Sequence, residues 1–256
     1  MVAEKQKSFQ EFYYKKTGAM VGVETVANYA LTHEDSTVIY DGQMLCPECE
    51  MAGLYFVNKT HLRKAHLRRL PSERHMDGCS YNYPRASKRT IQKHFDSLSK
   101  EQVQDKLDAV MRMLFKLPAK VDGMPQICDR KTLVNPMLLK ACKRNKEVIE
   151  SLRRKRLDAW MEETDTDEIF VFYGKVKLKS VQKEKVNTTT KYNVLEVYNV
   201  AKDGKEQFRT SLFRGTIKDC INEDSFYNIV IIGKVGNKGW QIEMLSIHAL
   251  KYREIR

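Results

Sequence analysis

The sequence predicts an α+β protein with a zinc-ribbon-like N-terminal module, a helical middle and a C-terminal five-stranded β-barrel. Two pairs of potential metal ligands lie within residues 37–84. The period of apolar residues changes from 3.6 to 2 after an acidic stretch, and five β-prone runs follow. We therefore expect residues 1–84 to form the N-terminal region, 85–161 the helical middle, 162–168 an acidic linker and 169–256 the barrel.

Composition narrows the class of protein. Hydrophobic residues make up 42% of the 256 residues, which is enough for two modest cores. A net charge of +12 favours polyanionic partners such as nucleic acid or an anionic membrane surface. No apolar run approaches the roughly 20 residues of a membrane-spanning helix, and the N-terminus lacks a signal peptide's apolar segment. We expect a cytoplasmic protein with reduced cysteines, a nucleic-acid partner, a protein partner as the alternative, and no membrane association.

The first forty-odd residues predict one or two helices followed by a strand. Phe9, Phe12 and Tyr13 have helical spacing, and residues 23–31 form an amphipathic pattern. Residues 37–40 are β-prone and precede an Asp-Gly turn. A strand and a turn before a CxxC motif are typical of a zinc ribbon.

Four residues have the spacing of a zinc site. Cys46 and Cys49 form a CxxC knuckle, and His75 and Cys79 form an HxxxC pair. Four thiolate and imidazole ligands can close a tetrahedron around Zn²⁺, and a site closed by four protein ligands contributes folding energy and leaves no position for a substrate. We therefore predict a structural zinc ion.

Other assignments of these residues remain open. The cysteines could be unligated buried thiols or ligands of an iron–sulfur centre, although the histidine disfavours iron–sulfur. His61 or His66 could replace His75 as the third ligand. Their arginine and lysine neighbours suggest a segment that faces solvent or phosphate, whereas residues 75–79 form a tight-turn sequence, which favours His75.

Residues 37–84 resemble the N-terminal zinc modules of bacterial competence-protein (CoiA-like) relatives. The resemblance rests on the Cys-Pro-Glu-Cys knuckle, the basic segment His-Leu-Arg-Lys-Ala-His-Leu at 61–67, and the HxxxC pair. In that family a CxxC precedes an "HFxH"-like element, and the corresponding residues 66–68 lack its aromatic residue. The resemblance implies a prokaryotic, DNA-related setting, and no nuclease signature of the family follows downstream.

The middle of the chain predicts two helices. Ser99 and Gln102 form a capping box ahead of an apolar face at Val103, Leu107, Val110 and Leu114 that stops at Pro118. A second helix is predicted from Asn135-Pro136. Its apolar residues are Leu139, Cys142, Ile149, Leu152 and Trp160. The basic cluster at 153–156 is interpreted either as the C-terminal end of that helix, where cations offset the negative end of the helix dipole, or as a nucleic-acid contact.

The C-terminal part predicts a barrel of five strands. The runs are Ile169–Val181, Tyr192–Val200, Gln207–Arg214, Phe226–Val235 and Trp240–Leu250. Turn sequences at 202–205 and 236–239 predict two hairpins, and residues 216–222 predict one or two helical turns. This order, with Gly174 where the long first strand must curve, resembles an OB-fold barrel.

Two basic surfaces are candidate nucleic-acid contacts. Residues 59–93 contain ten Lys or Arg residues and two acids. In the barrel, alternate residues of the first strand, from Val171 to Lys179, predict an exposed basic face that includes an aromatic. The alternative is that the aromatic residues fill the barrel. The predicted contacts are Arg63, Lys64, Arg68, Arg69, Tyr173, Lys175, Lys177, Lys183, Lys185, Lys191, Tyr198, Arg209 and Phe213.

The sequence therefore predicts a nucleic-acid-binding protein that holds single-stranded DNA or RNA through the OB-like barrel. A protein-interaction adaptor built on the same barrel is one alternative, and a metal-dependent nuclease is another. Asp165, Asp167 and Glu168 could hold Mg²⁺ in such a nuclease, but their surroundings favour a solvated linker. No nucleophile, paired carboxylates or phosphate-binding loop stands out, so we predict no catalytic residue.

Overall fold

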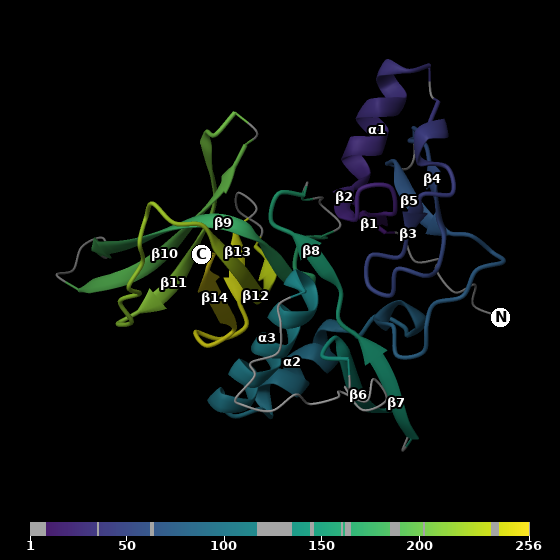
Figure 1. The fold of residues 1–256 in the computed structure, drawn as a ribbon. Helices are drawn as coiled ribbons and strands as arrows, with labels where there is room; N and C mark the ends of the chain where they lie inside the picture. The colour runs from purple at the N-terminus through teal and green to yellow at the C-terminus, as the bar shows by residue number, and fades with distance from the viewer. Residues whose placement is uncertain are drawn as a thin grey trace, which may run out of the picture. The chain divides into compact units, whose positions relative to one another are not determined.

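The computed structural model describes residues 9–34, 36–61, 64–116, 135–143, 146–159, 161, 165–184, 190–201, 203–236 and 241–255. The chain divides into two units, residues 1–84 and residues 85–256, each of which is described by itself below. Figure 1 labels their helices and strands. Within the described residues, no helix is long and apolar enough to cross a membrane.

The first unit combines short strands with one helix. Strand β1 pairs antiparallel with β2 and with β3, and β4 pairs antiparallel with β5. The elements are β1 (Glu11–Tyr14), β2 (Ala19–Gly22), α1 (Val23–Thr32), the 3₁₀ turn η1 (Val38–Tyr40), β3 (Met44–Leu45), β4 (Leu54–Val57), β5 (His66–Arg69) and the 3₁₀ turn η2 (Ser80–Asn82).

The predicted helix over Phe9, Phe12 and Tyr13 is wrong, because these residues are extended. The backbone N–H of Phe9 donates to the carbonyl of Leu67 at 3.0 Å, and Phe12 pairs with Val21 in the β1–β2 ladder. Long-range pairing has overridden the local spacing here. The predicted amphipathic helix at 23–31 is confirmed by α1.

The predicted strand at 37–40 is also wrong. The N–H of Tyr40 donates to the carbonyl of Thr37 at 2.8 Å and closes the 3₁₀ turn η1. This turn buries the Tyr40 ring against Phe12 and Tyr29 and leaves Val38 72% exposed. Burial of one aromatic ring therefore decides the local conformation.

In the second unit, helices α2 (Lys88–Asp96) and α3 (Lys100–Phe115) pack on one side of a large sheet. The capping box at Ser99 is confirmed: its hydroxyl accepts from the Gln102 N–H at 3.3 Å, and its own N–H donates to Gln102 Oε1 at 2.8 Å. Val103, Leu107 and Val110 are buried as predicted.

The second predicted helix is wrong, because the segment forms strands. β6 (Leu138–Lys143) and β7 (Lys146–Ser151) make an antiparallel hairpin, and β8 (Arg154–Arg156) pairs parallel with the next strand, β9. Met137 and Leu139 are buried while Lys140 is exposed, which is the period of a strand. Cys142 is exposed, and Trp160 lies outside the described residues.

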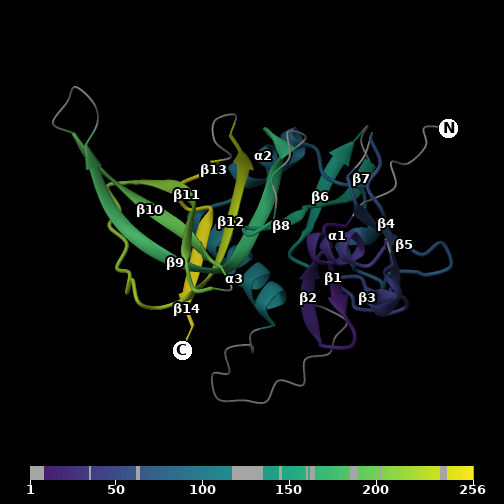
Figure 2. The ribbon, with the colours of Figure 1, turned by 90° about the horizontal axis from the view of Figure 1, so that it is seen from above.

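The C-terminal strands form a curled antiparallel half-barrel, visible in Figures 1 and 2. The strand order is β11-β10-β9-β12-β13, and β14 also pairs with β12. The strands are β9 (Ile169–Glu184), β10 (Lys191–Val200), β11 (Glu206–Gly215), β12 (Tyr227–Val235), β13 (Ile242–Met244) and β14 (Leu250–Glu254).

Two predictions about the connections of this sheet differ from the structure. The fifth β-prone run, 240–250, contains the short strand β13 followed by a bend and a turn, and β14 begins at its last residue. The predicted helical turns at 216–222 are a turn followed by irregular backbone, because Asp219 is held by Arg214 and Tyr252. The hairpin at 202–205 is confirmed for its described residues: the Ala201 N–H donates to Lys205 O at 2.9 Å, and Gly204 has a φ of +82°.

The first half of β9 is buried on both faces. Ile169, Val171 and Tyr173 belong to a core shared with α2, α3 and β6. Phe170 and Phe172 belong to the core inside the curled sheet. The prediction that Val171 and Tyr173 lie on an exposed face is therefore wrong, because helices cover that face. Beyond Gly174 the strand alternates, and Lys175 is exposed.

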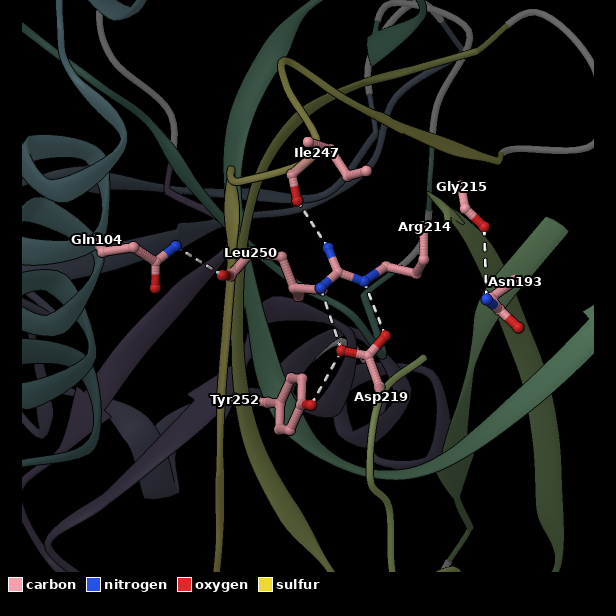
Figure 3. A network of polar contacts seen from close by, with 8 residues as sticks. All are labelled: Gln104, Asn193, Arg214, Gly215, Asp219, Ile247, Leu250 and Tyr252. Carbon is pink, nitrogen blue, oxygen red and sulfur yellow. Dashed lines mark hydrogen bonds and ion pairs between the residues drawn. The ribbon is translucent and has the colours of Figure 1, made fainter. Parts of the chain in front are cut away.

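A buried polar network joins distant segments of the half-barrel (Figure 3). The guanidinium of Arg214 donates to Asp219 through Nε at 2.8 Å and Nη2 at 3.1 Å, and to the Ile247 carbonyl at 2.6 Å. Tyr252 donates to the same carboxylate at 3.0 Å. These bonds fix the connection after β11 to the connection before β14.

Candidate metal centre and aromatic face

The four predicted metal ligands lie together in the first unit. The ligand atoms of Cys46, Cys49, His75 and Cys79 are all within 4.8 Å of one another. The sulfurs of Cys46 and Cys79 are 3.9 Å apart, and His75 Nδ1 lies 3.5 Å from the Cys49 sulfur and 3.7 Å from that of Cys79. Zn–S bonds of about 2.3 Å in a tetrahedron separate two sulfurs by about 3.8 Å. The group is thus suited to a zinc-like metal ion.

Two tight turns present these ligands. In the first turn the Glu50 N–H donates to Cys46 O at 3.0 Å and the Cys46 N–H donates to Ala52 O at 2.7 Å. In the second turn the Cys79 N–H donates to Met76 O at 3.1 Å. Gly78 has a φ of +78°, a conformation that a residue with a Cβ rarely adopts. Each turn thus directs its two ligand atoms toward one point.

Contacts outside the four ligands hold the turns to each other. The carboxylate of Glu48 accepts from the backbone N–H of Ser80 and, at 2.6 Å, from its hydroxyl, which ties the knuckle to the segment after Cys79. Phe9 stacks on Tyr81 with 4.5 Å between centroids and on His75 with 5.9 Å. Such contacts orient metal ligands.

Burial and mutual contact shift the pKa values of the thiols apart. Burial raises the pKa of Cys46 to about 12. Hydrogen bonds from the sulfurs of Cys46 and Cys79 lower the pKa of Cys49 below its ordinary value. Without a cation, three adjacent thiols, two of them buried, cannot all ionise, because like charges at this distance repel. A bound divalent cation would offset most of this repulsion and so favour the thiolate form of all three cysteines.

Neither alternative histidine joins the group. His66 lies in β5, where its Nδ1 donates to the Lys64 carbonyl at 2.9 Å, and His61 is exposed. The sequence favoured His75 through its turn, and the geometry agrees.

The predicted phosphate contacts of the first unit lie at 63, 64, 68 and 69, and not all of these side chains are available to a ligand. Arg69 donates to the carbonyls of Leu70, at 3.1 Å, and of Glu73, so its guanidinium is used within its own loop. Arg68 pairs across the hairpin with Tyr55, and Lys64 is exposed. Arg63 lies outside the described residues.

In the second unit, the register of β9, β10 and β11 places lysines and aromatic residues on one face. Tyr198 lies opposite Lys177 on one side and Phe208 on the other. Residues directly opposite in an antiparallel ladder share a face, and so do residues two apart on one strand. We call this surface the aromatic face; its members are Lys177, Lys179, Lys183, Tyr192, Glu196, Tyr198, Phe208 and Phe213.

Two aromatic pairs stand on this face. Tyr198 and Phe208 meet edge to face with centroids 5.7 Å apart, and Tyr192 and Phe213 lie 5.6 Å apart. Phe208 is 54% exposed and Phe213 is 60% exposed. Phe208 was absent from the predicted contacts, although the hairpin at 202–205 could have revealed it by aligning it with Tyr198.

The lysines of β9 and β10 form ion pairs with acids of the same sheet. Glu206 lies 3.2 Å from Lys177 and 2.9 Å from Lys179. Lys183 pairs with Glu196 at 2.9 Å, and Lys191 pairs with Glu184 at 3.5 Å. The ammonium of Lys175 lies 4.7 Å from the centroid of the Phe226 ring.

Four predicted contacts are not among the members of this face, namely Tyr173, Lys175, Lys191 and Arg209. Tyr173 is buried against Phe115. Arg209 is partly buried and donates through Nε to the Leu157 carbonyl at 2.7 Å. Lys185 lies outside the described residues.

The acids considered as Mg²⁺ ligands form ion pairs with basic residues of the second unit. Asp165 is buried and accepts from the buried Lys155 at 2.6 Å. Asp167 pairs with Lys88 and with Lys234, and Glu168 pairs with Arg85 at 2.9 Å.

Comparisons with protein-family models, with curated proteins and with solved structures found no match to this chain. The resemblance to CoiA-like zinc modules thus rests on the motif residues alone.

Proposed function

We propose that the protein binds single-stranded nucleic acid through the aromatic face, with the half-barrel acting as an OB-like barrel. The observation that carries the proposal is the register of β9–β11, which puts three lysines and two exposed aromatic pairs on one surface. Bases stack on aromatic rings, and ammonium groups contact phosphate. A surface that offers both suits a single strand whose bases are free to stack.

The ion pairs of the lysines do not prevent this binding. The Lys–Glu pairs of this face are partly exposed, and an ion pair near the protein surface contributes on the order of 1 kcal/mol or less, whereas stacking of one base on an aromatic ring contributes about 1–3 kcal/mol. A phosphate can therefore displace the carboxylates of Glu206 or Glu196 at a cost smaller than the gain.

We further propose that the Cys/His group holds a structural zinc ion. Four protein ligands leave no coordination position for water or substrate, so the ion would fix the fold of the module. Lys64 and Arg68 would add phosphate contacts from that module, in keeping with the DNA-related setting implied by its resemblance to CoiA-like relatives. Elemental analysis should find one zinc per chain, and C46S should lose it.

The nucleic-acid proposal is tested by fluorescence anisotropy with labelled single- and double-stranded DNA and RNA at several salt concentrations. Single strands should bind more tightly than duplexes. Comparison of the affinities for DNA and RNA shows which of the two the protein prefers. The triple variant K177Q/K179Q/K183Q removes three cations of the face. Three phosphate contacts on a single strand contribute a slope of about 2 in log K against log salt, so the slope should become shallower by that amount.

The matched control is K140Q, which removes an exposed lysine that pairs with Glu147 at 2.9 Å in another sheet. It should leave affinity unchanged. No binding by the wild type at low salt would contradict the proposal. In that case the exposed Phe208 and Phe213 would favour the alternative function, a protein-interaction adaptor, which pull-down of a stable complex would reveal.

A further inference from the structure

The geometry points to two separate base-stacking subsites on the aromatic face, so that the tight ligand is a single strand long enough to occupy both. This inference rests on the proposed function and specifies its ligand. The first subsite is the Tyr198–Phe208 pair, and the second is the Tyr192–Phe213 pair.

The two subsites lie at opposite ends of the β10–β11 ladder. Tyr198 is directly opposite Phe208, close to the hairpin that joins the strands. Phe213 is opposite Val194, and its ring reaches diagonally to Tyr192. Both phenylalanine rings are more than half exposed, so each pair offers a ring to a base without rearranging the core.

Tyr198 follows Tyr192 by six positions along β10. At about 3.3 Å per residue the subsites lie about 20 Å apart. A nucleic-acid strand with stacked bases advances about 3.4 Å per nucleotide, so about six nucleotides cover this distance, and fewer do so when the strand is extended. Such a site falls within the range of about 4–16 nucleotides for one OB-fold.

Each subsite has its own cation. The Lys179 ammonium lies 4.8 Å from the centroid of the Tyr198 ring, and Lys183 lies opposite Tyr192. Glu196 stands between the subsites, but it already accepts from Tyr198 at 2.7 Å and pairs with Lys183 at 2.9 Å. The negative charge of Glu196 is thus partly compensated, which reduces its repulsion of a phosphate backbone that crosses the face.

A duplex cannot use this arrangement, because its base faces are stacked inside the helix. A strand too short to span the face can occupy either subsite, but only one at a time. Once a longer strand has bound one subsite, its remaining bases are held at a high effective concentration near the other subsite. The second contact then forms within the same complex and raises the affinity.

The experiment measures binding of oligo-dT of 3 to 12 nucleotides to the wild-type chain and to F208L, F213L and the double variant. Leucine keeps apolar bulk but removes the aromatic ring. Wild-type affinity should rise steeply as the length passes about six nucleotides. For the 12-mer each single variant should lose about tenfold. For the 3-mer each should lose no more than about twofold, because the other subsite remains, and the double variant should lose most binding.

The control is I149A, which truncates an exposed apolar side chain on β7 outside the face and should match the wild type. Near-ultraviolet circular dichroism establishes that each variant is folded. A smooth dependence of affinity on length, or wild-type affinity of both single variants for the 12-mer, would overturn the two-subsite inference while leaving the proposed function intact. Absence of any 12-mer binding by the wild type at low salt would instead refute the proposed function.

Discussion

Arg214 and Asp219 are each only 8% exposed, and the guanidinium makes three hydrogen bonds that join distant segments of the half-barrel. Two of these bonds form a bidentate pair with the carboxylate. Transfer of both charges from water is costly, and this geometry offsets the cost only while both partners are present. The network therefore makes the stability of the second unit sensitive to either residue.

Replacing Arg214 with methionine should destabilise the second unit by about 3–5 kcal/mol, because it leaves a buried carboxylate without its cation. Urea unfolding measures the free energy. The control Y252F removes one hydrogen bond to the same carboxylate and should cost about 1 kcal/mol. A loss for R214M no larger than that of Y252F would show that Asp219 does not depend on the ion pair.

Tyr252 should make the free energy of unfolding of the second unit depend on pH in the alkaline range. Burial, followed by the charge of Asp219, raises the pKa of this phenol above its ordinary value near 10. Above that value the unfolded chain loses the Tyr252 proton while the folded chain retains it, so the free energy of unfolding should fall as pH rises beyond 10. Urea midpoints between pH 9 and about 11 test this. Y252F should show a shallower decline, and an equal slope would contradict the assignment.

The residues of the metal site could be predicted from sequence, whereas several residues of the barrel face could not. Cys46, Cys49 and Cys79 could be predicted because their spacing places them in two local turns, and such spacing is visible in the sequence. Whether Tyr173 or Arg209 is accessible depends instead on Phe115 and Leu157, which reach them from distant parts of the chain. Strand alternation alone does not contain that information.

At the scale of elements, local signals predicted α1 and α3 correctly. The hydroxyl and backbone N–H of Ser99 both find partners in Gln102, so the start of α3 is encoded in four residues. The hairpin β6–β7 lacked such a signal, because Pro136 and the apolar spacing fit a helix as well. Packing of Met137, Leu139 and Leu152 against α2 and α3 decides its conformation.

The cap of α3 can be tested by substitution. S99A should destabilise the second unit by about 1 kcal/mol, because the Gln102 N–H loses its acceptor at the helix start. S99D supplies a carboxylate acceptor at the same position and should stay near the wild type. Thermal or urea unfolding measures both variants. Equal stability of S99A and the wild type would mean that water replaces the cap without cost.

At the scale of the whole molecule, the two units should respond differently to loss of metal. The first unit has a small core that includes Cys46 and Cys79 themselves. Structural zinc sites contribute about 10–16 kcal/mol of apparent binding free energy, so a module of this size that holds such an ion should unfold when the ion is removed. The second unit has two larger cores and contains no member of the Cys/His group.

Chelation should therefore make residues 1–84 sensitive to protease while residues 85–256 persist as a resistant fragment. Mass spectrometry of the limited digest identifies the cleavage sites, and re-addition of Zn²⁺ should restore protection. A matched digest of C46S should resemble the chelated protein. Cleavage distributed equally over both units would contradict the separate dependence on metal.

The double burial of β9 also limits how the chain can be truncated. Ile169, Val171 and Tyr173 face α2, α3 and β6, while Phe170 and Phe172 face the inside of the curled sheet. A recombinant fragment that starts at residue 162 would keep every strand of the half-barrel but expose the first of these surfaces. An uncovered apolar sheet face of this kind promotes aggregation. The smallest soluble fragment that retains the aromatic face should thus begin near residue 85. Such a fragment includes α2 and α3 together with the half-barrel.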